Sequence, residues 1–194
     1  MSRAAVFDAL HGRDNDPWSV LTSPYEREKY AATLRSLSRP HYGATLEIGC
    51  SIGAMTVELA LRSDRVVAVD VSAVALAAAS ERCAGRGVAF VRTEVPEGWP
   101  PGTFDLIVLS EVLYFLTAEE VTACARSAVD GLAPEGEIVL VNWLGETDTP
   151  LTGEAAAECF IDAARKAGLA AYRDTRTPFY RIDRLTEAAR QAPG

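Results

Sequence analysis

Short runs of consecutive hydrophobic residues alternate along the chain with longer segments in which hydrophobic residues recur every three to four positions. The short runs are typical of strands buried on both faces, and the spaced pattern is typical of helices that bury one face. The short runs predict strands at 44–48, 65–71, 88–92, 104–110 and 136–143, and two further β-like stretches follow at 169–175 and 179–185. The spaced pattern predicts helices at 24–38, 54–63, 73–84, from 117 onward and at 154–167.

Two of these helices begin with capping signals. Ser23 precedes Pro24 and stands three residues before Glu26, and Thr117 stands three residues before Glu120. A hydroxyl followed three positions later by a carboxylate forms a capping box, in which each side chain bonds a free backbone N–H of the first helical turn. Both signals support the predicted helix starts.

The alternation of strands and helices predicts the fold class. It implies parallel strand pairing with helices on both faces of the sheet, which is the doubly wound α/β class. The 194 residues, of which 48% are hydrophobic, suffice for one domain with a single core. In such sheets ligands bind beyond the carboxyl ends of the strands, so we expect segments 47–53, 70–72, 93–95, 110–115 and 142–152 to surround one site.

The loop after the first predicted strand resembles a nucleotide-binding loop but lacks its middle glycine. It carries Gly49, Ser51 and Gly53, and Glu47 precedes it at the strand end. A pyrophosphate needs bare backbone where Ser51 stands, and the Glu47 carboxylate would repel it, which argues against an NAD-dependent dehydrogenase. Asp70, at the end of the second strand, can accept both hydroxyls of a ribose. A cationic adenosine ligand without phosphates fits this set, and S-adenosylmethionine has that description.

Charge and composition exclude several classes of partner. The net charge of −8 and the lack of any Lys/Arg run argue against nucleic acid. No stretch resembles a signal peptide or a membrane span of roughly 18 apolar residues, so we expect a cytoplasmic protein with no membrane contact. Neither the cysteines nor the two histidines show metal-ligand spacing, so we expect no metal, and we expect both histidines at the surface. These residues are Cys50, Cys83, Cys124, Cys159, His11 and His41.

Five segments follow one another along the chain: "EIGCSIG", "VVAVDVS", "VRTEVP", "FDLIVLSEVLYFL" and "LAPEGEIVLVNW". With these segments, most of the chain resembles a class I S-adenosylmethionine-dependent methyltransferase. The further segments "DPW", "SPYEREKY" and "TDTPLTG" make it similar to the nodulation protein S group, whose namesake N-methylates the free amine of a deacetylated chitin oligosaccharide. The resemblance implies a Rossmann-like domain at 41–194, with a mostly parallel seven-stranded sheet and an antiparallel edge strand. It also implies an N-terminal segment and lid helix at 1–40.

The resemblance also implies site residues. Those expected to bind S-adenosylmethionine, and its product S-adenosylhomocysteine, are Trp18, Tyr25, Lys29, Glu47, Gly49, Cys50, Ser51, Gly53, Asp70, Val71, Thr93, Glu94, Val95 and Ser110. Lys29 is expected to meet the cofactor carboxylate. The residues expected to contact the methyl acceptor are Glu111, Phe115, Asn142 and Trp143, and Glu111 and Tyr114 are the catalytic candidates.

We therefore expect N-methylation of an amino sugar or a similar small amine by a monomer or weak homodimer. An amine attacks only as the neutral base, and Glu111 or Tyr114 can orient it and receive its proton. O-methylation of a sugar or phenol is the nearest alternative, but it needs a base, and Asn142 stands where some relatives would carry an imidazole. A protein that binds S-adenosylmethionine without methyl transfer is a third alternative.

Overall fold

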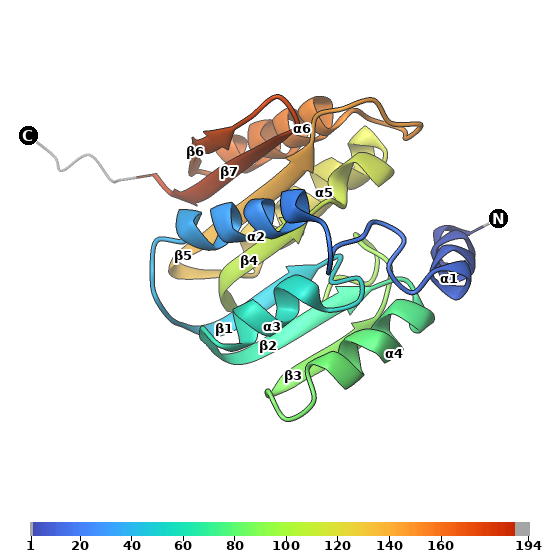
Figure 1. Cartoon of the computed structure of the whole chain (residues 1–194). Coiled ribbons are helices and arrows are strands. Elements are labelled where there is room, and N and C mark those ends of the chain that lie inside the picture. The colour runs from blue at the N-terminus through green and yellow to red at the C-terminus, as the bar shows by residue number, and fades with distance from the viewer. Residues whose placement is uncertain (1, 189–194) are drawn as a thin grey trace, which may run out of the picture.

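A seven-stranded sheet runs through the computed structural model, which describes residues 2–188, and helices cover both of its faces (Figure 1). The predicted α/β class is confirmed. The strand order is β3-β2-β1-β4-β5-β7-β6. The strands are β1 (Tyr42–Ile48), β2 (Ser63–Asp70), β3 (Val88–Arg92), β4 (Phe104–Ser110), β5 (Leu132–Trp143), β6 (Leu169–Arg176) and β7 (Tyr180–Glu187).

The first five strands pair in parallel, and β7 is antiparallel to both of its neighbours, β5 and β6. The predicted antiparallel strand is therefore present, but it lies inside the sheet, and β6 forms the edge. The short turn between β6 and β7 makes them a hairpin, so their pairing must be antiparallel. The order of β1 and β4 leaves a switch point at the carboxyl ends of these strands, where α/β sheets bind ligands.

The helices are α1 (Arg3–Arg13), α2 (Pro24–Ser36), α3 (Ala54–Ala60), α4 (Ala73–Arg82), α5 (Ala118–Asp130) and α6 (Gly153–Lys166). Alternation along β4 explains the two hydrophobic cores, because successive strand side chains point to opposite faces. Ile107 and Leu109 pack with residues of α5 and α6, and Leu106 and Val108 pack with residues of α2 and α3. In Figure 1, α2 and α3 lie in front of the sheet.

Helix α1 was not predicted from the sequence. Its hydrophobic residues do not form a continuous stripe, and the face that it turns inward carries Arg3 and His11 as well as Phe7. The capping box at Thr117 and Glu120 is confirmed. Ser23 also caps its helix by accepting from the Glu26 backbone N–H, but the Glu26 side chain bonds Lys29 instead of completing a box.

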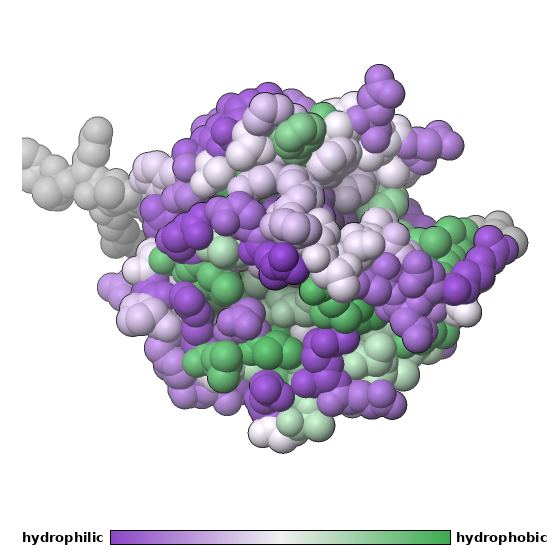
Figure 2. All heavy atoms as spheres, in the orientation of Figure 1, coloured by the Kyte–Doolittle hydropathy of each residue, from purple (hydrophilic) through white to green (hydrophobic). Residues whose placement is uncertain are grey.

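The predicted 41–194 unit includes residues 189–194, which lie outside the described residues. None of the helices within 2–188 is long and apolar enough to cross a bilayer. On the face in Figure 2, hydrophobic surface lies beside α1 and α3. Val6, Leu21 and Leu61 are among the exposed large hydrophobic residues.

Candidate active site

A cavity of about 720 Å³ lies at the carboxyl ends of the parallel strands. This volume is typical of a site for a small molecule or cofactor. The predicted site residues that line it are Trp18, Tyr25, Lys29, Glu47, Gly49, Cys50, Ser51, Asp70, Val71, Thr93, Glu94, Val95, Ser110, Glu111, Tyr114, Phe115 and Trp143. The strand-end loops therefore meet at one site, as the strand order requires.

Two predicted residues, Gly53 and Asn142, lie outside the lining of this cavity. Gly53 has a φ of 80° at the start of α3, and an added Cβ would lie 3.0 Å from Ala79 of α4, so its glycine serves the packing of the two helices. Asn142 is completely buried, one position before Trp143 on β5. Strand alternation turns Asn142 away from the face that Trp143 presents to the cavity.

The turn at Gly49 to Ser51 forms the floor of the cavity and is bonded to β2. Gly49 has a φ of 82°, and a Cβ there would lie 2.1 Å from the Val112 side chain, so only glycine fits. The backbone N–H groups of Gly49 and Cys50 donate to the Val69 carbonyl, and that of Ser51 donates to Asp70 Oδ2 over 2.9 Å. These bonds hold the loop against the Asp70 carboxylate.

Glu47 and Asp70 both line the cavity, Glu47 as a buried carboxylate and Asp70 as a half-buried one. Burial raises the pKa of Glu47 to about 7, although Thr56 donates a hydrogen bond of 2.6 Å to it, and the nearby Asp70 charge also raises it. Burial raises the pKa of Asp70 too, while backbone N–H groups of Ser72 and Ser51 oppose that shift. A bound cation would stabilise the ionised form of both carboxylates, and a bound anion would destabilise it.

A second charged cluster lies where α2 meets the end of β4. Lys29, with only 3% of its surface exposed, donates to Glu26 Oε1 over 3.0 Å and to Glu111 Oε1 over 2.6 Å. The Tyr114 hydroxyl and the Trp143 backbone N–H both donate to Glu111 Oε2, over 2.9 and 2.8 Å. Glu111 is thus fixed by three donors, and Lys29, expected at the cofactor carboxylate, lies between two carboxylates of the chain.

Burial raises the pKa of Glu26, and Lys29 opposes that shift. Burial and the Glu111 charge raise the pKa of Tyr114, so its phenol stays protonated and acts as a donor to Glu111. Glu111 itself has a φ of 58°, a left-handed conformation that is rare for residues other than glycine. Such strain at a ligand-facing residue is typical of functional sites.

Aromatic rings surround this cluster. The rings of Trp143 and Phe179 stack with centroids 6.0 Å apart and an interplanar angle of 15°, and Tyr25 meets both edge-on. Phe179 is 54% exposed although it lines the cavity. Phe179 was not predicted as a site residue, because the stretch that it begins, 179–185, showed only the pattern of a strand.

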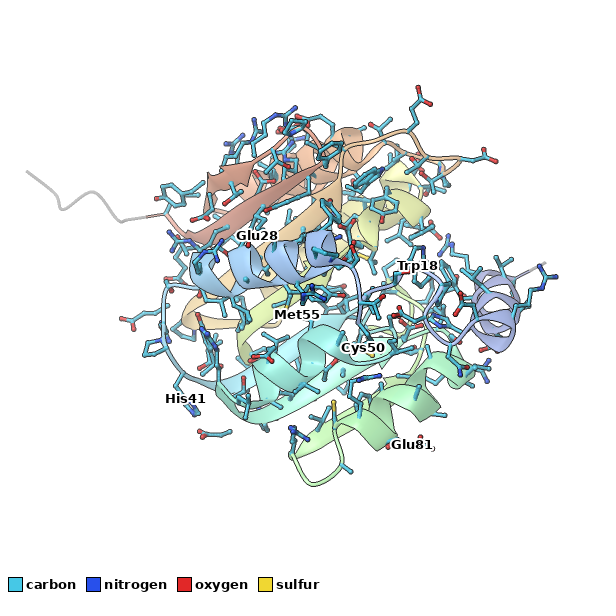
Figure 3. The ribbon with its side chains drawn as sticks, in the orientation of Figure 1. Trp18, Glu28, His41, Cys50, Met55 and Glu81 are labelled. Carbon is cyan, nitrogen blue, oxygen red and sulfur yellow. The ribbon has the colours of Figure 1, made fainter. Side chains whose placement is uncertain are left out.

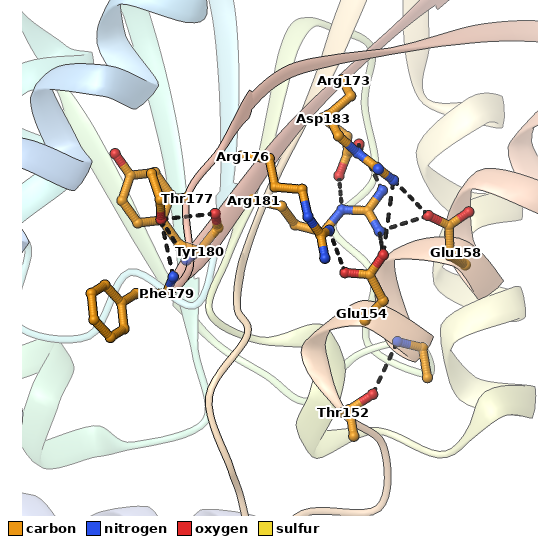
Figure 4. Close-up of polar contacts among 11 residues, drawn as sticks. Thr152, Glu154, Glu158, Arg173, Arg176, Thr177, Phe179, Tyr180, Arg181 and Asp183 are labelled. Carbon is orange, nitrogen blue, oxygen red and sulfur yellow. Dashed lines mark hydrogen bonds and ion pairs between the residues drawn. The ribbon is translucent and has the colours of Figure 1, made fainter.

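The hairpin end that carries Phe179 is held next to the start of α6 (Figure 4). Thr177 Oγ1 accepts from the backbone N–H groups of Phe179 and Tyr180. Arg181 has no exposed surface, and it donates to Asp183 at 2.6 and 2.8 Å and to Glu154 and Glu158 of α6 at 2.9 and 2.6 Å. These charge-assisted bonds fix β7 against the helix that follows the 144–152 loop.

On the opposite side, α1 and the segment after it cover the cavity. Figure 3 shows Trp18 between α1 and the rest of the molecule, and Cys50 at the loop before α3. The expected surface position of His11 is wrong, since only 1% of it is exposed, and its ring meets Trp18 edge-on at 5.3 Å. His41 is exposed, as expected. Because α1 was not predicted, the burial of His11, which lies on it, was not predicted either.

The family model for nodulation protein S (NodS) matches residues 8–167. This match spans most of the chain. The chain belongs to the nodulation protein S family.

Relatives within the NodS family support this membership. Nodulation protein S of Bradyrhizobium diazoefficiens is 35% identical over 128 residues, which are 64% of this chain and 61% of that protein. Nodulation protein S of Rhizobium tropici is 33% identical over 71% of this chain and 63% of its own length. The aligned part of the chain therefore spans about six tenths of these curated relatives.

The structure of N-methyltransferase NodS from Bradyrhizobium japonicum WM9 in complex with S-adenosyl-L-homocysteine matches with a TM-score of 0.79 at 25% identity. That match covers 95% of this chain and 97% of the other. A putative methyltransferase from Pseudomonas syringae matches with a TM-score of 0.72 at 30% identity, over 84% of this chain and 99% of the other. The fold of this NodS family member is thus the Rossmann-like fold of S-adenosylmethionine-dependent methyltransferases.

Proposed function

We propose that this protein is an S-adenosylmethionine-dependent methyltransferase that methylates the amino group of a small molecule, with an amino sugar as the favoured class of acceptor. Membership of the NodS family supports the activity, as does the match to an N-methyltransferase NodS that binds S-adenosyl-L-homocysteine. The observation that carries the choice of an amine is the pair of carboxylates, Glu26 and Glu111, around Lys29.

The residues at the strand ends fit the cofactor. Ser51 and Tyr25 line the cavity, and within residues 2–188 neither of their buried hydroxyl groups has a hydrogen-bond partner, which supports a polar ligand as that partner. In this proposal Glu47 and the 49–51 turn hold the methionine end, and Asp70 holds the ribose. The bound cofactor supplies a methyl group on a positively charged sulfur. The buried carboxylates favour that positive charge.

The acceptor would lie beside Glu111. Two carboxylates and one ammonium give the cluster of Glu26, Lys29 and Glu111 a net charge of −1, which attracts a cationic amine. The amine must lose a proton before it attacks, and the Glu111 carboxylate can hold that proton directly or through water. Tyr114 and the Trp143 N–H fix the direction of the carboxylate. Such orientation of reactants is worth roughly 7 to 11 kcal/mol in an enzyme.

The stacked rings of Trp143 and Phe179 support an acceptor with a flat, partly apolar face, such as a sugar ring. Aromatic side chains offer apolar contact of this kind at little cost in conformational entropy. O-methylation would need a base to activate a hydroxyl. The chain has two histidines, of which His11 lies at Trp18 and His41 is exposed and bonded to Asp64, so neither lies at Glu111.

The test is a matched set of acceptors incubated with labelled S-adenosylmethionine. A chitin oligosaccharide with one free amino group is compared with the same oligosaccharide fully N-acetylated, which has every hydroxyl but no amine. We expect product only from the first, with the label on nitrogen by mass spectrometry of fragments. Equal methylation of both would overturn the choice of an amine, and no transfer to any amine in a broader panel would overturn the activity.

A further inference from the structure

One face of α1 forms the roof of the cavity next to the proposed ribose position. Arg3, Phe7 and His11 are spaced four residues apart, which places them on one helix face, and all three line the cavity. The Phe7 ring meets Phe115 edge-on at 5.1 Å, so this face of α1 reaches the loop after β4. The roof is therefore built from the N-terminal helix, and His11 is its polar member nearest Trp18.

Arg3 on this face, and Asp8 next to Phe7, attach α1 to the segments that surround the cavity. Arg3 donates to Glu94 over 2.8 Å and to Glu120 over 2.6 Å. Asp8 accepts from the Ser72 hydroxyl over 2.7 Å and from Arg92 over 3.1 Å. Because Ser72 follows Asp70 by two residues, these bonds hold α1 close to the end of β2, where Asp70 lies.

The buried imidazole of His11 lacks a hydrogen-bond partner in the described part of the protein. Within residues 2–188, neither ring nitrogen has a hydrogen-bond partner, although His11 is almost fully buried and is part of the cavity lining. Leaving a buried polar group unbonded costs about 1 to 3 kcal/mol, and folded proteins seldom do so without a functional reason. A ligand atom in the cavity is the partner that this geometry leaves open.

The Asp70 carboxylate indicates which ligand atom this is. Its Oδ1 accepts from the Ser72 N–H and its Oδ2 from the Ser51 N–H, so the carboxylate has a fixed orientation and keeps further lone pairs for hydroxyl donors. A hydroxyl that donates to Asp70 still has lone pairs that can accept from an imidazole N–H. A ribose offers two neighbouring hydroxyls with these properties.

The protonation state of His11 suits this contact. Burial lowers the pKa of His11, while the charges of Asp70, Asp16, Asp8 and Asp14 oppose that shift. A neutral imidazole has one N–H donor and one acceptor nitrogen, so it can bond a hydroxyl without adding a charge beside the cationic cofactor.

We infer that His11 is a ribose-binding residue, whose ring N–H donates to a cofactor hydroxyl that is itself bonded to Asp70. This inference rests on the proposed function, since it needs an adenosine ligand in the cavity. It makes α1 a part of the cofactor site, and it gives the buried imidazole the partner that it lacks.

The test measures S-adenosylhomocysteine affinity by calorimetry in wild type, His11→Phe and His11→Gln, with His41→Phe as the matched control. We expect His11→Phe to weaken binding by roughly tenfold to a hundredfold, as the loss of one buried hydrogen bond implies, and His41→Phe to have no effect. Unliganded His11→Phe should unfold at the same temperature as wild type or higher, because it removes an unbonded polar group. If the Phe variant does not fold, His11→Gln, which keeps a donor, carries the comparison.

A second set of ligands identifies the contacted group. Adenosine is compared with 2′-deoxyadenosine and 3′-deoxyadenosine in wild type and in His11→Phe. If His11 bonds a ribose hydroxyl, the substitution should weaken adenosine binding more than the binding of one of the two deoxy ligands. Equal losses for all three ligands, or no loss for any, would overturn the inference. A wild-type protein that binds no S-adenosylhomocysteine would instead overturn the proposed function itself.

Discussion

Replacing Glu111 by glutamine tests whether this carboxylate serves the acceptor. The carboxylate accepts from Lys29 at Oε1 over 2.6 Å, and from Tyr114 and the Trp143 N–H at Oε2 over 2.9 and 2.8 Å. In Glu111→Gln, an amide oxygen at the place of Oε2 keeps the bonds from Tyr114 and the Trp143 N–H, and the NH₂ group then faces the Lys29 ammonium. One charge-assisted bond is lost, worth about 1.5 to 3 kcal/mol. Lys29 keeps Glu26 at 3.0 Å.

Because the Glu111 side chain is 22% exposed and water can reach it, we expect a loss of only about 1 to 2 kcal/mol in the free energy of unfolding. Turnover should fall by about 10² to 10⁴, the usual contribution of a general base. S-adenosylhomocysteine affinity should change by less than about threefold, or 0.7 kcal/mol.

The assay pairs single-turnover methyl transfer with calorimetry of S-adenosylhomocysteine binding. Glu28→Gln is the matched control, because Glu28 lies on the same helix as Lys29 with its side chain 66% exposed. Turnover of Glu111→Gln within about threefold of the control would refute the assignment. A parallel loss of turnover and cofactor affinity would move Glu111 to the cofactor site.

Three further substitutions have defined outcomes. Glu47→Gln should raise the free energy of unfolding of the unliganded protein at pH 8 by about 1 to 3 kcal/mol, measured by urea unfolding. Folded Glu47 keeps its proton up to about pH 7 and the unfolded chain releases it near 4.5, so wild-type stability falls as pH rises through that window. An equal fall in stability with pH in wild type and variant would contradict this. Arg181→Met leaves the buried Asp183 without its main partner and should lower the free energy of unfolding by about 3 to 5 kcal/mol in the same assay. Arg35→Met, at an exposed pair, should lower it by less than about 0.5 kcal/mol, and equal effects would show that the buried ion cluster adds no stability. Phe179→Ala should raise the KM for the acceptor about tenfold and leave S-adenosylhomocysteine affinity unchanged, and an unchanged KM would remove the ring from the acceptor site.

The residues of the proposed cofactor site followed from local sequence. Gly49 and Ser51 stand at a strand-to-helix turn, and Glu47 and Asp70 stand at strand ends, so the α/β strand order brings them together whatever the remaining side chains do. Gly53 shows the limit of the same motif. Its place in the pattern suggested ligand contact, but its close approach to Ala79 gives it a packing role.

The contacts at the proposed acceptor end could not be predicted in this way, because they join residues far apart in the chain. Lys29 and Glu111 are separated by 82 positions, and no local pattern states that α2 turns this lysine toward the end of β4. Phe179 reaches the cavity only because β7 inserts beside β5 and brings the hairpin end next to Trp143. Asn142 was predicted to contact the acceptor, but strand alternation places it on the opposite side of β5 from Trp143, outside the cavity lining.

By itself the sequence determined the α/β class and which strand-end residues meet at one cavity, because periodicity and strand-end residues act locally. The tertiary structure decided which side chains face one another across the cavity. It placed Glu111 under three donors and turned His11 from an expected surface residue into a buried one, since both outcomes depend on how α1 and α2 pack over the sheet. Packing between distant segments has no signature in a single stretch of sequence, and this is the physical reason for the division.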